Sequence, residues 1–464
     1  MFKILLYMII SIILISISNP VVSASPQTSG DSQNTATLPS LDAQGAVLIE
    51  QTTGRVLFEK NKDERLYPAS TSKILTALVA IENGDLEETV TVGNEANLAA
   101  LDGSKAGLDL GEQITLANLI KGLMLASGND AGYTIAVHIG RKISENPELS
   151  INDSLSVFTE LMNERAAETG AVNSNFLNPH GFHQENHYTT AYDLALITRE
   201  AIKNDDFRSL IASRIHEYPD WSSTQEDPSN PETRYWVSRN RLLNPASEFY
   251  YKHATGVKTG WTTPAGPCLV SSASQENGLD LIAVVLNTTR EGQWLDSVEL
   301  FEYGFNNYTF HRLVEQNRQV GAKDIEDYKL GGESEVNLVT QNGFEDLFRK
   351  TDIRNIRDHI EWSYNCPEGK SRFVAPISKG QTLGVLKYSL DGVTFFETNL
   401  LATDSIEKRT IINTIVYRLQ NYSLPLMILQ ILTGIILMIF MLRLIIKLKK
   451  KYKIKKKLTF RSFS

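Results

Sequence analysis

The sequence predicts an α+β fold, followed by a small all-β domain and one C-terminal transmembrane helix. In the body of the chain a hairpin pattern comes first, helical patterns fill the middle and strand patterns follow, which is an α+β order and not a βαβ order. Residues 312–402 then contain short stretches in which apolar and polar residues alternate, separated by glycines, as in a small all-β domain. Residues 423–442 carry no charge, and at 1.5 Å per residue such a helix spans about 30 Å, the thickness of the hydrocarbon core of a bilayer.

Residues 1–24 have the pattern of a secretory signal peptide. Lys3 precedes an apolar run over residues 4–17, and Val22-Ser23-Ala24 offers small residues for cleavage. The run is short for a membrane span, which needs about 20 residues, so we expect cleavage rather than an uncleaved anchor. Residues 25–42 are rich in Ser, Thr, Gln and Asn and predict a flexible leader.

Residues 43–311 form the predicted catalytic domain. Two apolar runs over residues 46–58 flank Thr52-Thr53-Gly54, which predicts a hairpin. Helical spacing and stop signals predict helices at residues 70–82, 115–125, 130–139 and 153–167, with Asp130 as the cap of the third. Strands follow at residues 254–259, 268–274 and 280–287, the last two joined by a turn containing Asn277-Gly278.

The small β domain at residues 312–402 contains no catalytic constellation, so we interpret it as a spacer or docking module. Residues 403–422 lead into the predicted span as a linker. Residues 443–464 hold ten Lys or Arg and no acid. Because basic residues next to a span mark its cytoplasmic end, we expect residues 25–422 outside the cell membrane and the basic tail inside, against anionic lipid.

The distribution of charge along the chain supports this predicted membrane topology. The whole chain carries −8, but 11 of its 46 basic residues and none of its 54 acids lie in residues 1–24 and 443–464. The remaining 35 basic residues leave −19 for residues 25–442. A body this acidic argues against nucleic acid as a main partner, because phosphate binding needs a basic surface.

Ser70-Thr71-Ser72-Lys73 places a hydroxyl and an amine three residues apart at a helix start. Residues i and i+3 share a helix face, so the Lys73 amine can take the proton of Ser70 if burial or a neighbouring cation lowers its pKa. The free N–H groups and dipole of the helix N-terminus favour an oxyanion nearby. This motif alone is weak, since Ser405-Ile406-Glu407-Lys408 matches it too.

Two further motifs follow in the chain. Ser127-Gly128-Asn129 lies between two predicted helices, where a tight turn can aim both polar side chains into a cleft. This motif alone is also weak, since Ser150-Ile151-Asn152 and Ser238-Arg239-Asn240 match the same S-x-N pattern. Lys258-Thr259-Gly260 lies on a predicted strand. A cation and a hydroxyl beside a residue without a side chain suit a strand edge that binds a carboxylate-bearing substrate.

The three motifs together, in this order and each on the expected element, are far more specific than any one. The segments around them, at residues 68–73, 127–131 and 256–260, resemble the low-molecular-mass penicillin-binding proteins that act as D-alanyl-D-alanine carboxypeptidases, of the type-5-like kind. So do Asn178-Pro179-His180-Gly181-Phe182 and the stretch at residues 190–193. The resemblance covers residues 40–400 and implies a serine DD-peptidase/β-lactamase-like domain, with an antiparallel sheet and a helical subdomain.

The resemblance also implies the role of each motif residue. Ser70 would be the nucleophile, Lys73 its base, and Ser127 would pass a proton to the leaving D-alanine while Asn129 orients Lys73 and the substrate amide. Lys258, Thr259 and Gly260 would bind the terminal carboxylate. The oxyanion hole would be backbone N–H groups of Ser70 and of the strand at residues 258–261. The substrate would be the peptidoglycan stem pentapeptide, and β-lactam antibiotics would acylate the same serine. We expect no cofactor and no metal.

Other polar residues carry weaker hypotheses. His180, His183 and His187 lie close together in sequence, but no Cys or His pair at zinc-ligand spacing accompanies them, so we expect a loop bordering the cleft. The sequence does not distinguish His187 from Tyr188 as a cleft residue. Arg290 could bind the carboxylate, although a surface ion pair is the plainer reading. Only two cysteines are present, too few for a disulfide framework, and we expect both to be buried thiols.

Two alternatives to the carboxypeptidase remain at this point. A class A β-lactamase would lack the extra β domain and the anchor, and it would carry a glutamate in an E-x-x-L-N loop, which the sequence lacks. A penicillin-binding sensor would need a cytoplasmic domain, and the 22 residues of the basic tail are too few for one. We therefore favour the carboxypeptidase over both alternatives.

Overall fold

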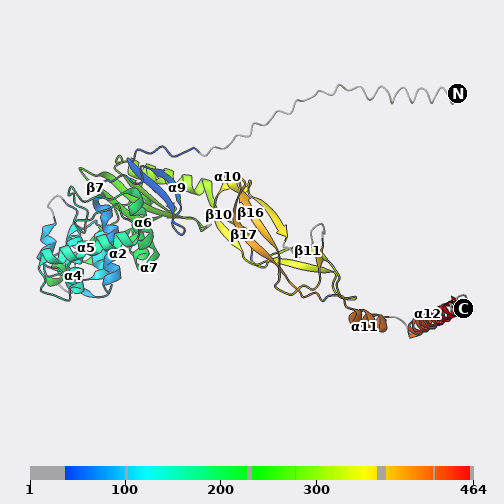
Figure 1. The fold of residues 1–464 in the computed structure, drawn as a ribbon. Helices are drawn as coiled ribbons and strands as arrows, with labels where there is room; N and C mark the ends of the chain where they lie inside the picture. Colours follow the sequence, from blue (N-terminus) through cyan, green and yellow to red (C-terminus); the bar gives the residue numbers. More distant parts are fainter. Residues whose placement is uncertain are drawn as a thin grey trace, which may run out of the picture. The chain divides into compact units, whose positions relative to one another are not determined.

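The computed structural model describes residues 37–99, 103–226, 232–276, 278–362, 372–421 and 424–459. The predicted signal peptide and most of the leader lie outside the described residues, as do Asn277 and Cys366. The chain divides into two compact units, one ending at Asn307 and one beginning at Tyr308 (Figure 1). This boundary falls four residues before the one expected from the sequence.

A five-stranded antiparallel sheet organises the first unit, in the order β2-β1-β9-β8-β7. The strands are β1 (Gly45–Glu50), β2 (Val56–Lys60), β7 (Ala254–Thr262), β8 (Gly266–Ser274) and β9 (Asp280–Leu286). The predicted hairpin and the three later strands are confirmed. The chain leaves the sheet after β2 and returns at β7, so the polar motifs of the intervening helices come to lie beside the edge strand β7.

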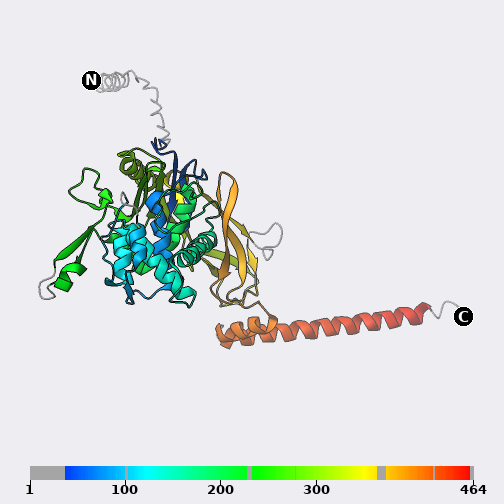
Figure 2. The ribbon, with the colours of Figure 1, turned by 90° about the vertical axis from the view of Figure 1, so that its left-hand side faces the viewer.

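Side chains on a strand alternate between the two faces of a sheet, and in this sheet helices cover both faces. Val47 and Ile49 join the main hydrophobic core with the helical group. Leu48 points the other way, toward Gly304 of α9 (Gly292–Asn307), where an added Cβ would lie 2.9 Å from Leu48 Cδ2. Figures 1 and 2 show α9 along the sheet, away from the helical group.

The helical group fills the middle of the first unit. Its helices are α2 (Lys73–Asn83), α3 (Leu116–Met124), α4 (Asn129–Ile143), α5 (Ile151–Glu168), α6 (Ala191–Lys203) and α7 (Asp205–Ala212). The four predicted helices are confirmed to within a few residues, whereas α6, α7 and α9 were not predicted. Side-chain oxygens of Thr115, Ser150 and Thr190 cap α3, α5 and α6. The predicted cap of α4 is wrong: Asp130 lies within the first turn, and the preceding Gly128 has no side chain to cap with.

A hairpin made of β5 (Ile215–Pro219) and β6 (Thr233–Val237) extends from the helical group (Figure 2). On one face, His216 and Tyr218 both stack on Trp236. The Trp236 indole N–H donates to the carbonyl of Ala106 over 2.8 Å. This bond fixes the start of the chain segment that runs on to Arg239. The shorter elements of this unit are η1 (Ala69–Ser72), β3 (Thr89–Thr91), η2 (Asn94–Leu98), β4 (Gln113–Thr115), α8 (Trp221–Glu226) and η3 (Arg241–Leu243).

The second unit begins with a β domain. A six-stranded sheet has the order β14-β16-β17-β12-β11-β15, and β10 pairs with β13. The strands are β10 (Tyr308–Val314), β11 (Gln319–Glu326), β12 (Glu335–Thr340), β13 (Phe344–Arg349), β14 (Arg357–Trp362), β15 (Phe373–Val374), β16 (Thr382–Leu390) and β17 (Val393–Ala402). Its core includes Leu338, Leu383 and Ala402. The prediction of a β domain is confirmed, with one short helix, α10 (Lys350–Ile353), inside it.

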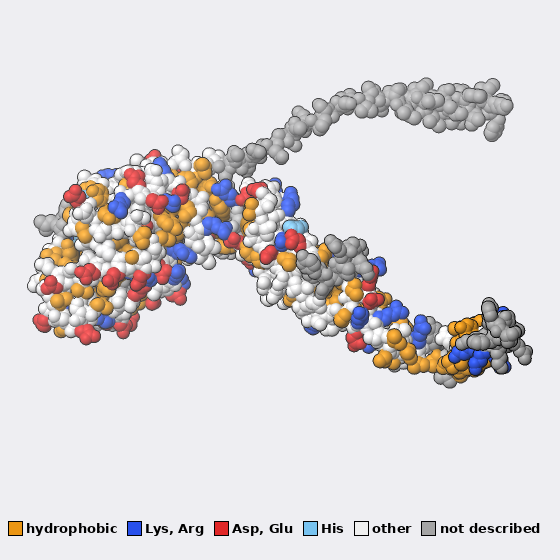
Figure 3. Space-filling view, viewed as in Figure 1, with side chains coloured by type: hydrophobic (Ala, Val, Ile, Leu, Met, Phe, Trp, Pro, Cys, Tyr) orange, Lys and Arg blue, Asp and Glu red, His pale blue; other side chains and the backbone are white. Residues whose placement is uncertain are grey.

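Two helices end the chain. The segment expected as a linker contains α11 (Ile411–Asn421), and α12 (Leu424–Thr459) runs through the expected span into the basic tail. Residues 425–453 are long and apolar enough to cross a membrane, and they are exposed in the structure. Hydrophobic side chains gather on this helix in Figure 3. The C-terminal apolar helix therefore fits a membrane anchor.

Candidate active site

Ser70 lies in the 3-10 turn η1, which leads directly into α2. The spacing of three residues brings Lys73 Nζ to 2.9 Å from Ser70 Oγ. The Ser70 side chain is half-buried at the wall of a cavity, whereas Lys73 is fully buried behind it. The hydroxyl is therefore open to a ligand, while the amine is shielded from water.

Three oxygen atoms lie within hydrogen-bonding distance of the Lys73 amine. One is Ser70 Oγ, and Nζ donates to the other two, Asn129 Oδ1 over 2.7 Å and the carbonyl oxygen of His180 over 2.8 Å. Burial, followed by the positive charges of Lys258 and Arg239, holds the pKa of Lys73 well below its usual value, with Asp130 opposing. A neutral amine has two N–H groups and one lone pair. Asn129 and His180 accept the two N–H bonds, which leaves the lone pair for the Ser70 hydroxyl.

Ser127 occupies the turn between α3 and α4. Its φ of +61° lies in the left-handed region, which residues with a side chain rarely adopt. Gly128 allows a close approach, since a Cβ there would lie 2.7 Å from Asp130 Oδ1 and 2.8 Å from Ala106 Cβ. The turn holds Ser127 Oγ 3.0 Å from Lys258 Nζ, which donates to it.

Lys258 lies on β7 and is 2% exposed. Its ammonium group also donates to the carbonyl of Thr259 over 2.9 Å. Burial, together with the charge of Arg239, lowers the pKa of Lys258 to about 7. The site thus holds two buried amines, and no carboxylate of the described residues lies within hydrogen-bonding distance of either.

Gly260 lets β7 pass close to the nucleophile turn. A Cβ at this position would lie 2.9 Å from the carbonyl oxygen of Pro68 and 3.1 Å from the amide nitrogens of Ser70 and Thr71. Every other residue type would push the strand away from Ser70. The absence of a side chain therefore keeps backbone N–H groups of the turn and of the strand together.

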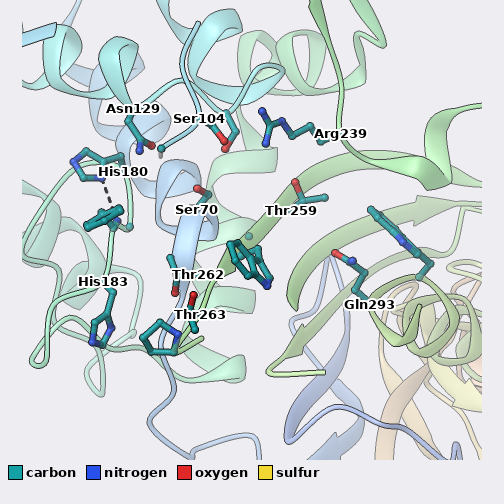
Figure 4. Close-up of a pocket in the computed structure, with 18 residues that line it drawn as sticks. Ser70, Ser104, Asn129, His180, His183, Arg239, Thr259, Thr262, Thr263 and Gln293 are labelled. Atoms are coloured by element: carbon teal, nitrogen blue, oxygen red, sulfur yellow. Dashed lines mark hydrogen bonds between the residues drawn. The ribbon is translucent and has the colours of Figure 1, made fainter. Parts of the chain in front are cut away.

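These groups border one cavity of about 500 Å³. The cavity is lined by Ser70, Ser127, Asn129 and Thr259 and by residues 103–104, 180–183, 261–264 and 293–294, and the exposed members of its lining form its rim. Figure 4 shows Ser70 facing the cavity between Asn129 and Thr259. Trp261, 59% exposed, and Phe182, 41% exposed, give the rim an apolar character.

The structure brings all seven sequence-predicted site residues together. Ser70, Ser127, Asn129, Thr259 and Gly260 line the cavity, and Lys73 and Lys258 lie behind them. Of the weaker candidates, His180 and His183 line the cavity and His187 does not. Tyr188 borders a separate hollow, where Arg65 stacks on its ring. Arg290 is exposed and lies outside the cavity lining. Cys268 is a buried free thiol, as expected.

The sequence analysis did not identify two residues, Arg239 and Asp130, as part of the site. Arg239 is exposed at the cavity rim and lowers the pKa values of both buried lysines. Asp130 is buried, and its carboxylate accepts backbone N–H bonds from Ala106, Gly107 and Leu108 at 2.8–3.2 Å. This bonding ties the loop that carries the 103–104 rim to the turn of Ser127. A charged residue immediately after Ser127-Gly128-Asn129 was the available signal for Asp130.

Comparisons with known proteins cover both units. The model of the D-alanyl-D-alanine carboxypeptidase family matches residues 32–290, and that of the penicillin-binding protein 5 C-terminal domain matches residues 308–408. The D-alanyl-D-alanine carboxypeptidase DacF of Bacillus subtilis is 32% identical over 373 residues, covering 79% of this chain and 86% of that protein. DacA of Haemophilus influenzae is 28% identical over 394 residues, covering 83% and 90%.

Solved structures agree. Penicillin-binding protein 5 from Haemophilus influenzae superposes with a TM-score of 0.55 at 28% identity, over 80% of this chain and 99% of that one. The Streptomyces K15 DD-transpeptidase superposes with a TM-score of 0.51 at 29% identity, over 58% and 99%. Fold and site define the chain as a serine hydrolase with a DD-peptidase domain and a C-terminal all-β domain. It belongs to the D-alanyl-D-alanine carboxypeptidase family, peptidase family S11, and is similar to type-5 penicillin-binding proteins.

Proposed function

We propose that this enzyme removes the terminal D-alanine from peptidoglycan stem pentapeptides through an acyl-enzyme on Ser70. The observation that carries the proposal is the buried Lys73 amine, 2.9 Å from Ser70 Oγ. Its lowered pKa and its two other hydrogen bonds favour a neutral amine whose lone pair faces the hydroxyl. The first alternative, a β-lactamase, does not account for the C-terminal β domain.

Acylation begins when Lys73 takes the Ser70 proton and Oγ attacks the carbonyl carbon of the penultimate D-alanine. The resulting oxyanion accepts hydrogen bonds from backbone N–H groups of Ser70 and of β7, which Gly260 keeps close together. The C–N bond then breaks, and the leaving nitrogen receives a proton through Ser127. Asn129 orients both the Lys73 amine and the substrate amide for this transfer.

The terminal carboxylate of the substrate binds at Lys258 and Thr259. Lys258 donates to Ser127, so the same ammonium group can hold both the carboxylate and the proton-transferring hydroxyl. Arg239 adds positive charge at the rim. A carboxylate next to these cations stabilises the charged form of Lys258. Water then attacks the acyl carbon and releases the shortened peptide and the free Ser70 hydroxyl.

Penicillins acylate the same serine, because the strained β-lactam amide and its neighbouring carboxylate occupy the places of the scissile bond and the terminal carboxylate. The test is to incubate the detergent-solubilised enzyme with labelled penicillin and map the labelled peptide. We expect the label on Ser70, and D-alanine release from a pentapeptide that is lost in Ser70→Ala. Label on another residue, or D-alanine release by Ser70→Ala at the wild-type rate, would contradict the proposal.

A second measurement separates hydrolysis from transfer. The similar Streptomyces K15 structure is titled a DD-transpeptidase, so an acceptor amine should be added to the assay. We expect free shortened peptide as the main product. A predominant amine adduct would instead identify a transpeptidase, with the same acyl-enzyme.

We also propose a topology. The signal peptide at residues 1–24 is removed, the catalytic and β domains lie outside the cell membrane, and α12 spans it with the basic tail inside. The apolar helix and the ten basic residues support this orientation. Alkaline carbonate should leave the protein in the membrane pellet, and protease added to protoplasts should degrade the catalytic domain. Extraction by carbonate would indicate peripheral attachment.

A further inference from the structure

The residue before the nucleophile is held in an unfavourable conformation. Ala69 has φ +48°, in the left-handed region that residues with a Cβ rarely adopt. Such a conformation persists only where neighbouring groups enforce it. Because Ala69 directly precedes Ser70, the groups that hold Ala69 also set the direction of the Ser70 side chain.

A hydrogen-bond chain ends on the carbonyl of Ala69. The Ser72 hydroxyl donates to this carbonyl over 3.1 Å, and Ser72 Oγ lies 2.9 Å from His187 Nε2. Both residues are buried: Ser72 is 0% exposed and His187 is 1% exposed. Neither lines the cavity, so this chain of hydrogen bonds lies behind the cavity lining.

The hydrogen bonds determine the tautomer of His187. Its Nδ1 lies 3.1 Å from the backbone N–H of Leu177 and must accept from it. The ring proton is therefore on Nε2, which donates to Ser72 Oγ and leaves the Ser72 proton for the Ala69 carbonyl. Burial, followed by His183, lowers the pKa of His187 to about 4, which keeps the ring neutral at physiological pH.

The loop that carries His187 also holds the base. Its His180 carbonyl accepts from Lys73 Nζ over 2.8 Å. Its Gly181, with φ +79°, packs so tightly that a Cβ there would lie 1.8 Å from the Ala69 oxygen. The Ala69 carbonyl is thus enclosed by Ser72 and by this loop.

We propose that His187, acting through Ser72, is a positioning residue that holds Ala69 and thereby aims the Ser70 hydroxyl at the substrate carbonyl. The proposal rests on the proposed role of Ser70 as the nucleophile. His187 touches neither the cavity nor Ser70, so its loss should slow the bond-forming step and leave binding of the ligand almost unchanged.

Two substitutions of His187 form a matched pair. In His187→Gln, the amide nitrogen reaches the position of Nε2 and still donates to Ser72, but no acceptor remains for Leu177. In His187→Asn, the amide oxygen can accept from Leu177, but the side chain is too short to reach Ser72. The two variants therefore separate a role through Ser72 from a role in fixing the loop.

The measurement is penicillin acylation of the full-length enzyme, resolved into the dissociation constant of the first complex and the acylation rate constant. For His187→Asn we expect that rate constant to fall about 10- to 100-fold, because small misplacements of reacting groups can reduce rates by about 10². The dissociation constant should change less than about threefold, and His187→Gln should keep most of the rate. A normal rate in His187→Asn with a loss in His187→Gln would overturn the proposal.

Ser72→Ala provides a second route if His187→Asn does not fold. It should slow acylation to a similar extent, and combining it with His187→Asn should add little, because both changes break one chain of hydrogen bonds. Wild-type acylation rates in Ser72→Ala, or rate losses that simply follow the loss of thermal stability in all variants, would overturn the proposal. Label on a residue other than Ser70 in the wild type would instead refute the proposed function.

Discussion

Gly260→Ala tests whether the close approach of β7 to the nucleophile turn sets the rate of acylation. The added Cβ would lie 2.9 Å from the Pro68 oxygen and 3.1 Å from the amide nitrogens of Ser70 and Thr71, all of them backbone atoms. Backbone atoms cannot rotate aside, so β7 must move by a few tenths of an ångström. Since a misplacement of about 1 Å can reduce a rate by about 10², this shift should slow acylation about tenfold, or ~1.4 kcal/mol.

The assay for Gly260→Ala is the second-order rate of labelling by penicillin, with a thermal unfolding curve for each protein. Overpacking should also lower the free energy of unfolding by about 1–3 kcal/mol. Gly304→Ala is the control, because its Cβ would lie 2.6 Å from Leu281 Cδ1 and 2.9 Å from Leu48 Cδ2, away from the site. That variant should lose stability and react normally. Labelling of Gly260→Ala within twofold of wild type would refute the geometric argument.

Three further predictions concern charge and burial. First, kcat/KM should rise with pH as Lys73 becomes neutral. It should fall again above about pH 7 as Lys258 loses its proton, because the pKa of Lys258 in the free enzyme is about 7. A flat profile of kcat/KM between pH 6 and 9 would contradict these assignments. Second, Asp130→Ala should lower the free energy of unfolding by about 2–4 kcal/mol in urea titrations, because it leaves several buried N–H groups unpaired; a change below about 0.5 kcal/mol would contradict this role. Third, Cys268 should resist iodoacetamide in the native protein and react after unfolding, since burial raises its pKa to about 12, and peptide mapping of the alkylated protein would show whether it does.

The sequence predicted those parts of the site that depend on local spacing. Ser70 and Lys73 meet because they lie three residues apart at the start of a helix, and Lys258 lies on a strand whose pattern is clear. Nothing in the spacing could show that Lys258 contacts Ser127, 131 residues away. Arg239 was unpredictable for the same reason, since only the folded hairpin before it brings it to the rim.

Some elements were missed although a signal existed. The buried residues of α9 include Leu300, Gly304 and Phe305, which have helical spacing and were readable from the sequence. The role of His187 was not readable. Its importance depends on the strained φ of Ala69, and an alanine directly before an S-x-x-K motif gives no hint of that conformation.

The two buried lysines couple folding to proton release. Both amines have a usual pKa near 10.5, which they regain when the chain unfolds, whereas in the folded chain that of Lys258 is about 7 and that of Lys73 is well below its usual value. Between about pH 7 and 10.5 the unfolded chain therefore binds more protons, and the free energy of unfolding rises with pH across this window. Below pH 7 the folded chain bears the full penalty of a buried charge at Lys258. An anionic ligand that pairs with the Lys258 ammonium group offsets that penalty, so we expect ligand binding to stabilise the fold as well as to start the chemistry.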